Sequence, residues 1–273
     1  MSCNRFQLIN SMLHPTSQET VRRGQPGYDR WVKIRFFVES INEHIKKYLF
    51  PFQNLSIDES IVGMKNRCSY IQYLPNKRHS RYGTKKFELC DSFSDYINHI
   101  ELYSGSDYLE DNCGPFTQKV VIQLLEKSEL FDKGYHIFLS NFYTKIPLVE
   151  VLSLQNTFVS GTINKNSKGL PKSILPAKLG ERESIYFREK KLLLVKYQQK
   201  ISQKPVLVLT LDCHVEDQMI TSKKGLRCMK PLVIHKYNQS METIDATDKS
   251  IYHYSCTITT PTYSTGKKLF MNF

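Results

Sequence analysis

The amino-acid sequence predicts a mixed α/β fold, and three observations support this prediction. Hydrophobic residues make up 40% of the 273 residues and aromatic residues 12%, which is enough to build a buried core. Apolar side chains recur at helical spacing in some segments and fill strand-sized runs in others. Predicted helices and strands are interleaved along the chain, which is typical of α/β proteins.

The first half of the chain predicts a helix, a group of strands and a second helix. Residues 28–50 predict the first helix because apolar side chains from Trp31 to Tyr48 recur at steps of three and four, and Pro51 ends it. Turn residues then separate four predicted strands, at residues 55–62, 68–74, 86–91 and 96–103. Residues 117–131 predict the second helix, which Gly134 follows.

The second half predicts more strands and helices, with one boundary between them. Residues 135–139 predict a short strand that ends at Ser140, and a helix at residues 146–154 follows. A strand is predicted at residues 158–163, and the stretch 164–180 after it is rich in Lys, Ser, Gly and Pro, so we place a boundary there. Beyond it, strands are predicted at residues 184–188, 191–197, 205–211 and 232–236, and a helix at residues 241–254.

This order of elements predicts an RNase H-like fold, because such a fold begins with three meander strands, a helix and a further strand. The boundary after the core strands predicts that a β-rich insertion lobe interrupts this fold. We therefore divide the chain into an N-terminal helical lead-in (1–54), the first part of the core (55–163), the β-rich insertion (164–236), a final core helix (237–256) and a loose tail (257–273).

Positive charge is concentrated in three stretches, within a net charge of +12. Residues 60–87 contain seven basic residues and no acid, residues 165–204 contain eleven against three acids, and residues 219–236 contain five and none. Each run alone is typical of a solvated surface, but together they favour a polyanionic partner such as a phosphate backbone. The residues that we assign to DNA binding are Lys65, Arg67, Lys77, Arg78, Arg81, Lys85 and Lys86.

Composition also argues against several other classes of protein. The seven cysteines include no C-x-x-C pair, so the sequence predicts reduced thiols, without a zinc site or a disulfide framework. No run of 18 apolar residues occurs, and the first residues lack the apolar core of a secretion signal. We therefore expect an intracellular protein, nuclear or cytoplasmic, with no membrane partner and no small-molecule substrate.

Carboxylates stand at most of the positions that chemistry on an RNase H-like fold requires. Such a site joins acids from the first strand, the end of the fourth strand and a later helix, which hold two Mg²⁺ ions about 3.5–4 Å apart. Asp58 lies in the first strand, where an acid is costly to bury unless a cation meets it. Asp245 and Asp248 are three residues apart on the last helix and share a face. The strand at residues 135–139, which takes the place of the fold's fourth strand, offers Ser140 and Asn141 at its end instead of an acid.

Three ordered blocks of sequence surround these positions. The first is Leu55-Ser56-Ile57-Asp58-Glu59, continued by Gly63-Met64-Lys65-Asn66-Arg67-Cys68, Tyr73-Leu74-Pro75-Asn76-Lys77, Tyr82-Gly83-Thr84-Lys85 and Leu89-Cys90-Asp91-Ser92. The second is Gly134-Tyr135-His136-Ile137-Phe138-Leu139-Ser140-Asn141-Phe142-Tyr143-Thr144, followed by Gly161-Thr162-Ile163. The third is Tyr237-Asn238 with Met241-Glu242-Thr243-Ile244-Asp245 and Asp248. Over about residues 4–254, these blocks resemble the catalytic core of piggyBac transposases.

The resemblance implies a DDD transposase on an RNase H-like fold with a β-rich insertion, which cuts and rejoins DNA with Mg²⁺. By the resemblance, Asp58 takes the first catalytic and metal-binding position, and Asp245 takes the third. Asp248 matches a nearby supporting acid, and the second catalytic position falls on Ser140. A serine hydroxyl is uncharged at neutral pH and cannot replace an anionic Mg²⁺ ligand, so we expect no cofactor. The family's Gly-Gly before the third aspartate is Glu242-Thr243 here, which adds bulk beside it.

The resulting hypothesis is a piggyBac transposase-derived protein that is catalytically inactive and binds DNA weakly, without sequence preference. Three alternatives stay open. An active Mg²⁺-dependent transposase or nuclease would need a substitute ligand such as Asn141 or Asp91. An interaction scaffold would make no nucleic-acid contact, and a decayed coding sequence would have no selected function. In the last two cases the aspartates would be ordinary structural or surface acids.

Overall fold

The computed structural model describes residues 2–12, 21–63, 71–75, 81–103, 105, 115–221, 225 and 227–254. The predicted tail (257–273) and the first part of the strand predicted at residues 68–74 lie outside these residues. The helices are α1 (Cys3–Met12), α2 (Arg35–Tyr48), α3 (Phe116–Lys127), α4 (Ile146–Leu154) and α5 (Leu232–Tyr254). The strands are β1 (Asn54–Gly63), β2 (Ile71–Tyr73), β3 (Tyr82–Asp91), β4 (Ile97–Leu102), β5 (His136–Leu139), β6 (Phe158–Thr162), β7 (Ser184–Glu189), β8 (Leu192–Tyr197), β9 (Val206–Thr210), β10 (Asp217–Thr221) and β11 (Arg227–Pro231).

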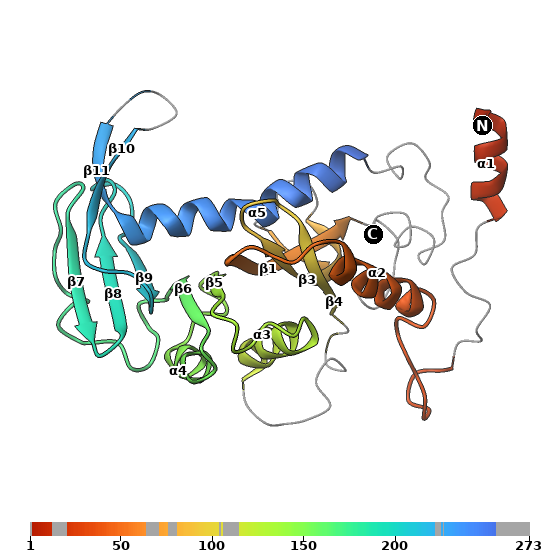
Figure 1. Cartoon of the computed structure of the whole chain (residues 1–273), viewed down its shortest axis with the longest axis horizontal. Helices are drawn as coiled ribbons and strands as arrows, with labels where there is room; N and C mark the ends of the chain where they lie inside the picture. Colours follow the sequence, from red (N-terminus) through yellow and green to blue (C-terminus); the bar gives the residue numbers. More distant parts are fainter. Residues whose placement is uncertain are drawn as a thin grey trace.

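Nine of the described strands form one sheet, in the order β2-β3-β1-β5-β6-β9-β8-β7, with β4 also paired to β3. β1 runs antiparallel to β3 and parallel to β5, and β5 runs parallel to β6. This is the core of an RNase H-like fold: a meander of three antiparallel strands followed by two parallel strands that the connecting helices allow. In Figure 1 the long helix α5 crosses one side of the sheet, and α3 and α4 lie on the other.

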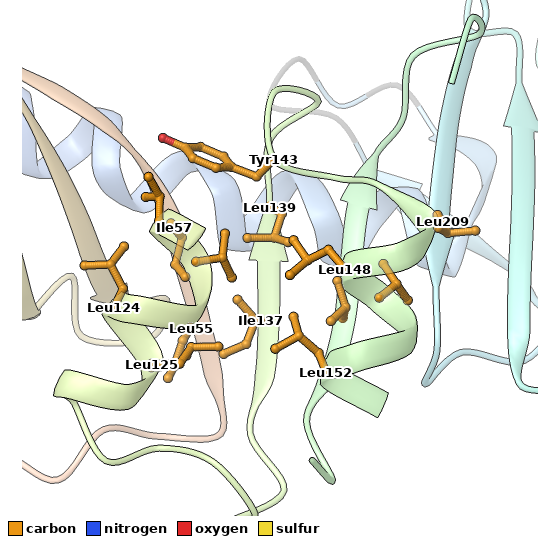
Figure 2. Close-up of a cluster of buried hydrophobic side chains, with 14 of the residues drawn as sticks. Leu55, Ile57, Leu124, Leu125, Ile137, Leu139, Tyr143, Leu148, Leu152 and Leu209 are labelled. Carbon is orange, nitrogen blue, oxygen red and sulfur yellow. The ribbon is translucent and has the colours of Figure 1, made fainter. Parts of the chain in front are cut away.

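The face of the sheet that α3 and α4 cover, which we call the apolar face, holds the main hydrophobic core (Figure 2). Because side chains alternate along a strand, β1 contributes Leu55 and Ile57 to it, and the neighbouring β5 contributes Ile137 and Leu139. All four are completely buried. They pack against helix side chains that include Leu124, Leu125, Leu148 and Leu152.

The opposite face, which we call the polar face, lies under α5 and differs in composition. Its buried polar side chains include Ser56, Ser60, Lys86, Glu88, His136, Ser160 and Thr210, with the half-buried Asp58 and Thr162 among them, and the buried Phe138 and Cys90 lie on the same face. The pairing registers place these residues on one side, since directly opposite residues of adjacent strands share a face. Apolar clusters border this face on both sides, under α2 and at the first turns of α5.

Helix α2 begins at Arg35, several residues later than the predicted start at residue 28. The preceding residues form turns that Asp29 holds together, because its carboxylate accepts hydrogen bonds from the Trp31 backbone N–H (2.9 Å) and from the Arg35 guanidinium (2.5 Å from Nε). Trp31 and Ile34 are buried beside Val38, as the apolar spacing predicted, although they precede the helix.

The predicted β-rich insertion contains five strands, but three of them extend the central sheet. β9 pairs with β6, and β8 and β7 follow outward from it, so the sheet is continuous from the core into this region. β10 and β11 form a separate two-stranded hairpin, which the sequence analysis did not predict. The strand predicted at residues 232–236 is wrong, because these residues form the start of α5. Val233 and Ile234 favour strands by their branching, but here they pack from the helix against β8 and β9.

Candidate functional site

Asp58 and Ser140 occupy neighbouring positions where two parallel strands meet. The last paired residues of β1 and β5 are Ile57 and Leu139, so Asp58 and Ser140 come next on each strand. Both side chains are half-buried. The turn after β5 is fixed by the Ser140 carbonyl, which accepts hydrogen bonds from the backbone N–H of Tyr143 (3.2 Å) and from the backbone N–H (3.1 Å) and the hydroxyl (2.9 Å) of Thr144.

Gly161 in β6 allows this turn to pack closely on the sheet. A Cβ atom at this position would lie 2.1 Å from Thr144 Oγ1 and 2.9 Å from the Leu139 carbonyl oxygen, far closer than atoms can approach. The second sequence block therefore requires glycine at this position, because any side chain here would displace the turn that follows Ser140.

The acids on α5 lie on the same side of the sheet as Asp58. Asp248 is half-buried and accepts a hydrogen bond from the hydroxyl of Ser60, two residues beyond Asp58 on β1. Asp245 is exposed on the same helix. Tyr237, nearer the start of α5, bonds to the Thr162 hydroxyl (3.0 Å), and burial together with the nearby charge of Asp58 raises its pKa.

These residues do not fit a two-metal centre. Within the described part of the chain, no three His, Cys, Asp or Glu side chains lie close enough together to hold a metal ion. The position next to Asp58 carries the neutral hydroxyl of Ser140, and Asp248 is engaged by Ser60. Two Mg²⁺ ions need several oxygen ligands, most of them anionic, converging on one point.

The two substitute ligands considered from sequence are arranged differently. Asp91 is completely buried, and its carboxylate accepts hydrogen bonds from the Phe52 N–H (3.1 Å), the Phe93 N–H (2.9 Å) and the Ser94 hydroxyl (3.0 Å). It therefore joins the chain before β1 to the turn after β3. Asn141 is exposed on the turn after Ser140.

A buried ion pair on β3 lies beside Asp58, and sequence reasoning missed it. Glu88 stands directly opposite Asp58, and Lys86 stands opposite Ser60. Lys86 Nζ lies 2.5 Å from Glu88 Oε1, and both side chains are almost completely buried. The two-residue spacing put both on one face of a predicted strand, but only the central place of β3 in the sheet shows that this face is covered.

Lys85 projects to the opposite face from Lys86 and is also buried. Its ammonium lies over three aromatic rings, at 4.9 Å from the centroid of Phe87, 5.6 Å from that of Tyr103 and 5.1 Å from that of Phe142. Such cation–π contacts stabilise a positive charge that water does not reach. Neither Lys85 nor Lys86 lies on an exposed basic surface, because β3 is paired on both edges and covered on both faces, so we leave both out of the DNA-binding surface.

The other predicted DNA-binding residues are exposed where the structure describes them. Arg81 is exposed beside Tyr73 and Tyr82, which form an exposed cross-strand ring pair with centroids 4.7 Å apart. Lys65, Arg67, Lys77 and Arg78 lie outside the described residues. Of the eleven basic residues between 165 and 204, ten are exposed. The exception is Lys196, whose buried ammonium donates to the carbonyls of Ile174, Leu175 and Ala177.

None of the helices in the described residues is both long enough and apolar enough to span a membrane.

Comparison with known proteins places the chain in a transposase family. The family model described as Transposase IS4 matches residues 1–273. The human PiggyBac transposable element-derived protein 3 is 25% identical over 94% of this chain and 44% of its own length. The human Chimeric ERCC6-PGBD3 protein is also 25% identical, over 94% of this chain and 25% of its own length. This chain therefore spans less than half of either curated relative.

A solved structure confirms the predicted RNase H-like fold. The cryo-EM structure of a piggyBac transposase synaptic complex with hairpin DNA matches with a TM-score of 0.76 and 23% identity, over 100% of this chain and 56% of that one. At this identity the match establishes the fold alone. The family match over the whole sequence shows that the chain belongs to the Transposase IS4 family, and the relatives that it resembles are piggyBac-derived proteins.

Proposed function

We propose that this transposase-derived protein no longer cuts DNA. The observation that carries the proposal is Ser140, which stands beside Asp58 on the adjacent parallel strand, where the family resemblance expects an acid. A neutral hydroxyl supplies no charge to hold a divalent cation. Strand cleavage on this fold depends on such cations to activate the attacking oxygen and stabilise the leaving oxygen.

The third block supports the same proposal. Thr243 is buried where the family has a glycine, and its carbonyl accepts a hydrogen bond from the Thr247 hydroxyl (3.1 Å). Thr247 also bonds to the Asp95 carbonyl (3.4 Å), which anchors this part of α5 to the turn after β3. Asp245 lies between Thr243 and Thr247 and is exposed, so the bulk that replaces the family's glycines stands directly beside it.

The test is Mg²⁺-dependent nicking of a DNA hairpin or a transposon-end duplex. We expect no cleavage by the wild type, and none by Ser140→Asp, because Glu242 and Thr243 would still add bulk beside Asp245. Ser140→Asp should nevertheless raise Mg²⁺ affinity, since it restores a carboxylate beside Asp58. Robust nicking by the wild type that Asp58→Ala abolishes would show that the site works and that the proposal is wrong.

We further propose that the protein retains weak, non-specific DNA binding. The exposed basic residues of the insertion and Arg81 beside two exposed tyrosines support this, because Lys and Arg bind phosphates and aromatic rings stack on bases. The solved transposase with this fold is, by its title, a complex with hairpin DNA. Non-specific dissociation constants on the order of 10⁻⁴ to 10⁻⁶ M are typical at physiological salt.

Salt dependence distinguishes this proposal from an interaction scaffold. The logarithm of the DNA affinity should fall steeply with the logarithm of salt concentration and should change little with DNA sequence. Lys190→Gln/Lys191→Gln, in the exposed turn between β7 and β8, should flatten the slope, whereas Glu189→Gln at the end of β7 should not. A slope near zero for the wild type would favour a scaffold without nucleic-acid contact.

A further inference from the structure

The buried pair of Lys86 and Glu88 occupies the centre of the polar face. Glu88 is 0% exposed and Lys86 1% exposed, and their charged atoms lie 2.5 Å apart. Oε2 of Glu88 has no hydrogen-bond partner among the described residues. A fully buried carboxylate is costly in this situation unless a cation compensates its charge.

The pair is part of the same group of side chains as the transposase-like acids. Glu88 faces Asp58 directly across the β1–β3 ladder, and Lys86 faces Ser60, whose hydroxyl donates to Asp248. Directly opposite side chains have Cβ atoms about 4.5–5.5 Å apart, and a long lysine side chain also reaches diagonal neighbours. Lys86 therefore lies diagonally opposite Asp58, on the same face and next to Glu88.

The surroundings of Cys90, the next residue of β3 on this face, agree with this arrangement. Burial raises the pKa of the Cys90 thiol well above its ordinary value. The negative charges of Glu88 and Asp248 act in the same direction, and the positive charge of Lys86 opposes them. The charges of Lys86, Glu88 and Asp248 thus all act on this buried thiol.

We propose that Lys86 supplies the counter-charge of this carboxylate group, so that its ammonium takes the place that a divalent cation has in a metal-binding cluster. This inference rests on the proposed loss of DNA cleavage. It identifies the positive charge that compensates the buried acids in a centre that does not fit two metal ions. The protein then folds without a metal, and the polar face keeps its buried acids at the cost of its metal affinity.

Replacing the lysine should convert a metal-independent protein into a metal-dependent one. Lys86→Met keeps most of the side-chain volume but removes the charge, leaving Glu88 and Asp58 beside the Ser60 hydroxyl. Two carboxylates together with water molecules are a sufficient ligand set for a divalent ion that prefers oxygen ligands, such as Mn²⁺. We expect Mn²⁺ to raise the Tm of Lys86→Met by about 5 °C or more relative to EDTA, because a ligand that binds only the folded state stabilises it. The wild type should show no such rise.

Two double variants identify the ligands. Lys86→Met/Asp58→Asn and Lys86→Met/Glu88→Met each remove one of the two carboxylates, so both should lose the rise in Tm with Mn²⁺. The second also replaces the ion pair by two apolar side chains of similar volume, which buried sites tolerate, and so it should fold without metal. If Lys86→Met unfolds in EDTA, its folding in Mn²⁺ becomes the supporting result.

The proposal is overturned if the wild type gains the same Tm with Mn²⁺, or if Lys86→Met gains none. It is also overturned if Lys86→Met stays unfolded with and without Mn²⁺ while Lys86→Met/Glu88→Met folds. These measurements use unfolding and not DNA cleavage, so they separate the two proposals. A wild type that nicks DNA contradicts the proposed function. A Lys86→Met variant whose Tm does not change with Mn²⁺ contradicts only the role of Lys86.

Discussion

The two faces of the central sheet are built from the same strands but hold together in different ways. On the apolar face, Leu55, Ile57 and Leu139 pack against α3 and α4 and are completely buried. On the polar face, Asp58 and Glu88 lie under α5 among hydroxyls and one ammonium. The first face is stabilised by burial of apolar surface, which does not depend on exact partners.

The polar face, by contrast, depends on contacts between particular polar and charged groups. Ser60 donates to Asp248, Lys86 contacts Glu88, and Ser160 bonds to both the His136 ring (2.8 Å) and the Thr210 hydroxyl (2.6 Å). A buried polar group costs free energy when its partner is lost, whereas an apolar neighbour can be exchanged for another. The comparison teaches that the same strands carry one face that tolerates exchanged neighbours and one face that depends on particular polar and charged partners.

The largest effect should come from separating the buried ion pair on the polar face. Glu88→Met removes the carboxylate that Lys86 contacts, and leaving a buried charge without its counter-charge typically costs about 3–5 kcal/mol. Chemical denaturation measures this loss. The matched control is Lys46→Met, which breaks the surface pair of Lys46 and Glu129 and should cost less than about 1 kcal/mol. Equal losses of unfolding free energy in the two variants would show that the buried ion pair contributes no more to stability than the surface pair.

The next effect sharpens the comparison from the apolar side. Leu139→Ala removes a completely buried side chain from the core in Figure 2, and such truncations cost about 2–5 kcal/mol, depending on how well the cavity collapses. Leu154→Ala at the end of α4 is the control, because that side chain is 86% exposed and its truncation should change stability by about 0.5 kcal/mol or less. A loss at Leu139 close to that of the control would contradict the assignment of the main core to this face.

Sequence patterns predicted the elements of the core well because each carries its own local signal. The helix at residues 146–154 agrees with α4, and the strand at 135–139 matches β5 within one residue. The prediction that Asp58 and Ser140 lie on adjacent strands followed from a family resemblance that the comparisons confirm. These predictions needed only periodicity, turn residues and ordered motifs.

What failed depended on contacts between distant segments. Lys85 and Lys86 belong to a basic run that looks solvated in sequence, but both are buried because β3 is a central strand. One charge is compensated by aromatic rings and the other by Glu88, and no local pattern contains that information. Residues 232–236 were predicted as a strand but form the first turns of α5, where packing against β8 and β9 overrides the strand preference of the β-branched Val233 and Ile234.

The smallest predicted effect lies at the edge of the polar face, where Asp212 meets His136. The Asp212 carboxylate lies 3.6 Å from His136 Nδ1, and this contact holds its pKa below the ordinary value of 3.8 despite partial burial. A carboxylate with a lowered folded-state pKa stabilises the protein above its unfolded pKa and loses that contribution as the pH falls through the folded value. Asp212→Asn should therefore reduce Tm slightly at neutral pH and make the loss of Tm below about pH 4 shallower.

The effect of Asp212→Asn should be small, because its side chain is 42% exposed and water screens the contact. Thermal unfolding followed by circular dichroism between about pH 6 and pH 2 measures it. Asp132→Asn, at an exposed acid in the turn after α3, is the control and should leave the shape of the curve as in the wild type. If Asp212→Asn also leaves the dependence of Tm on pH below about pH 4 unchanged, the contact with His136 contributes nothing to stability. The electrostatic contribution of the polar face to stability would then come from the buried pair of Lys86 and Glu88 alone.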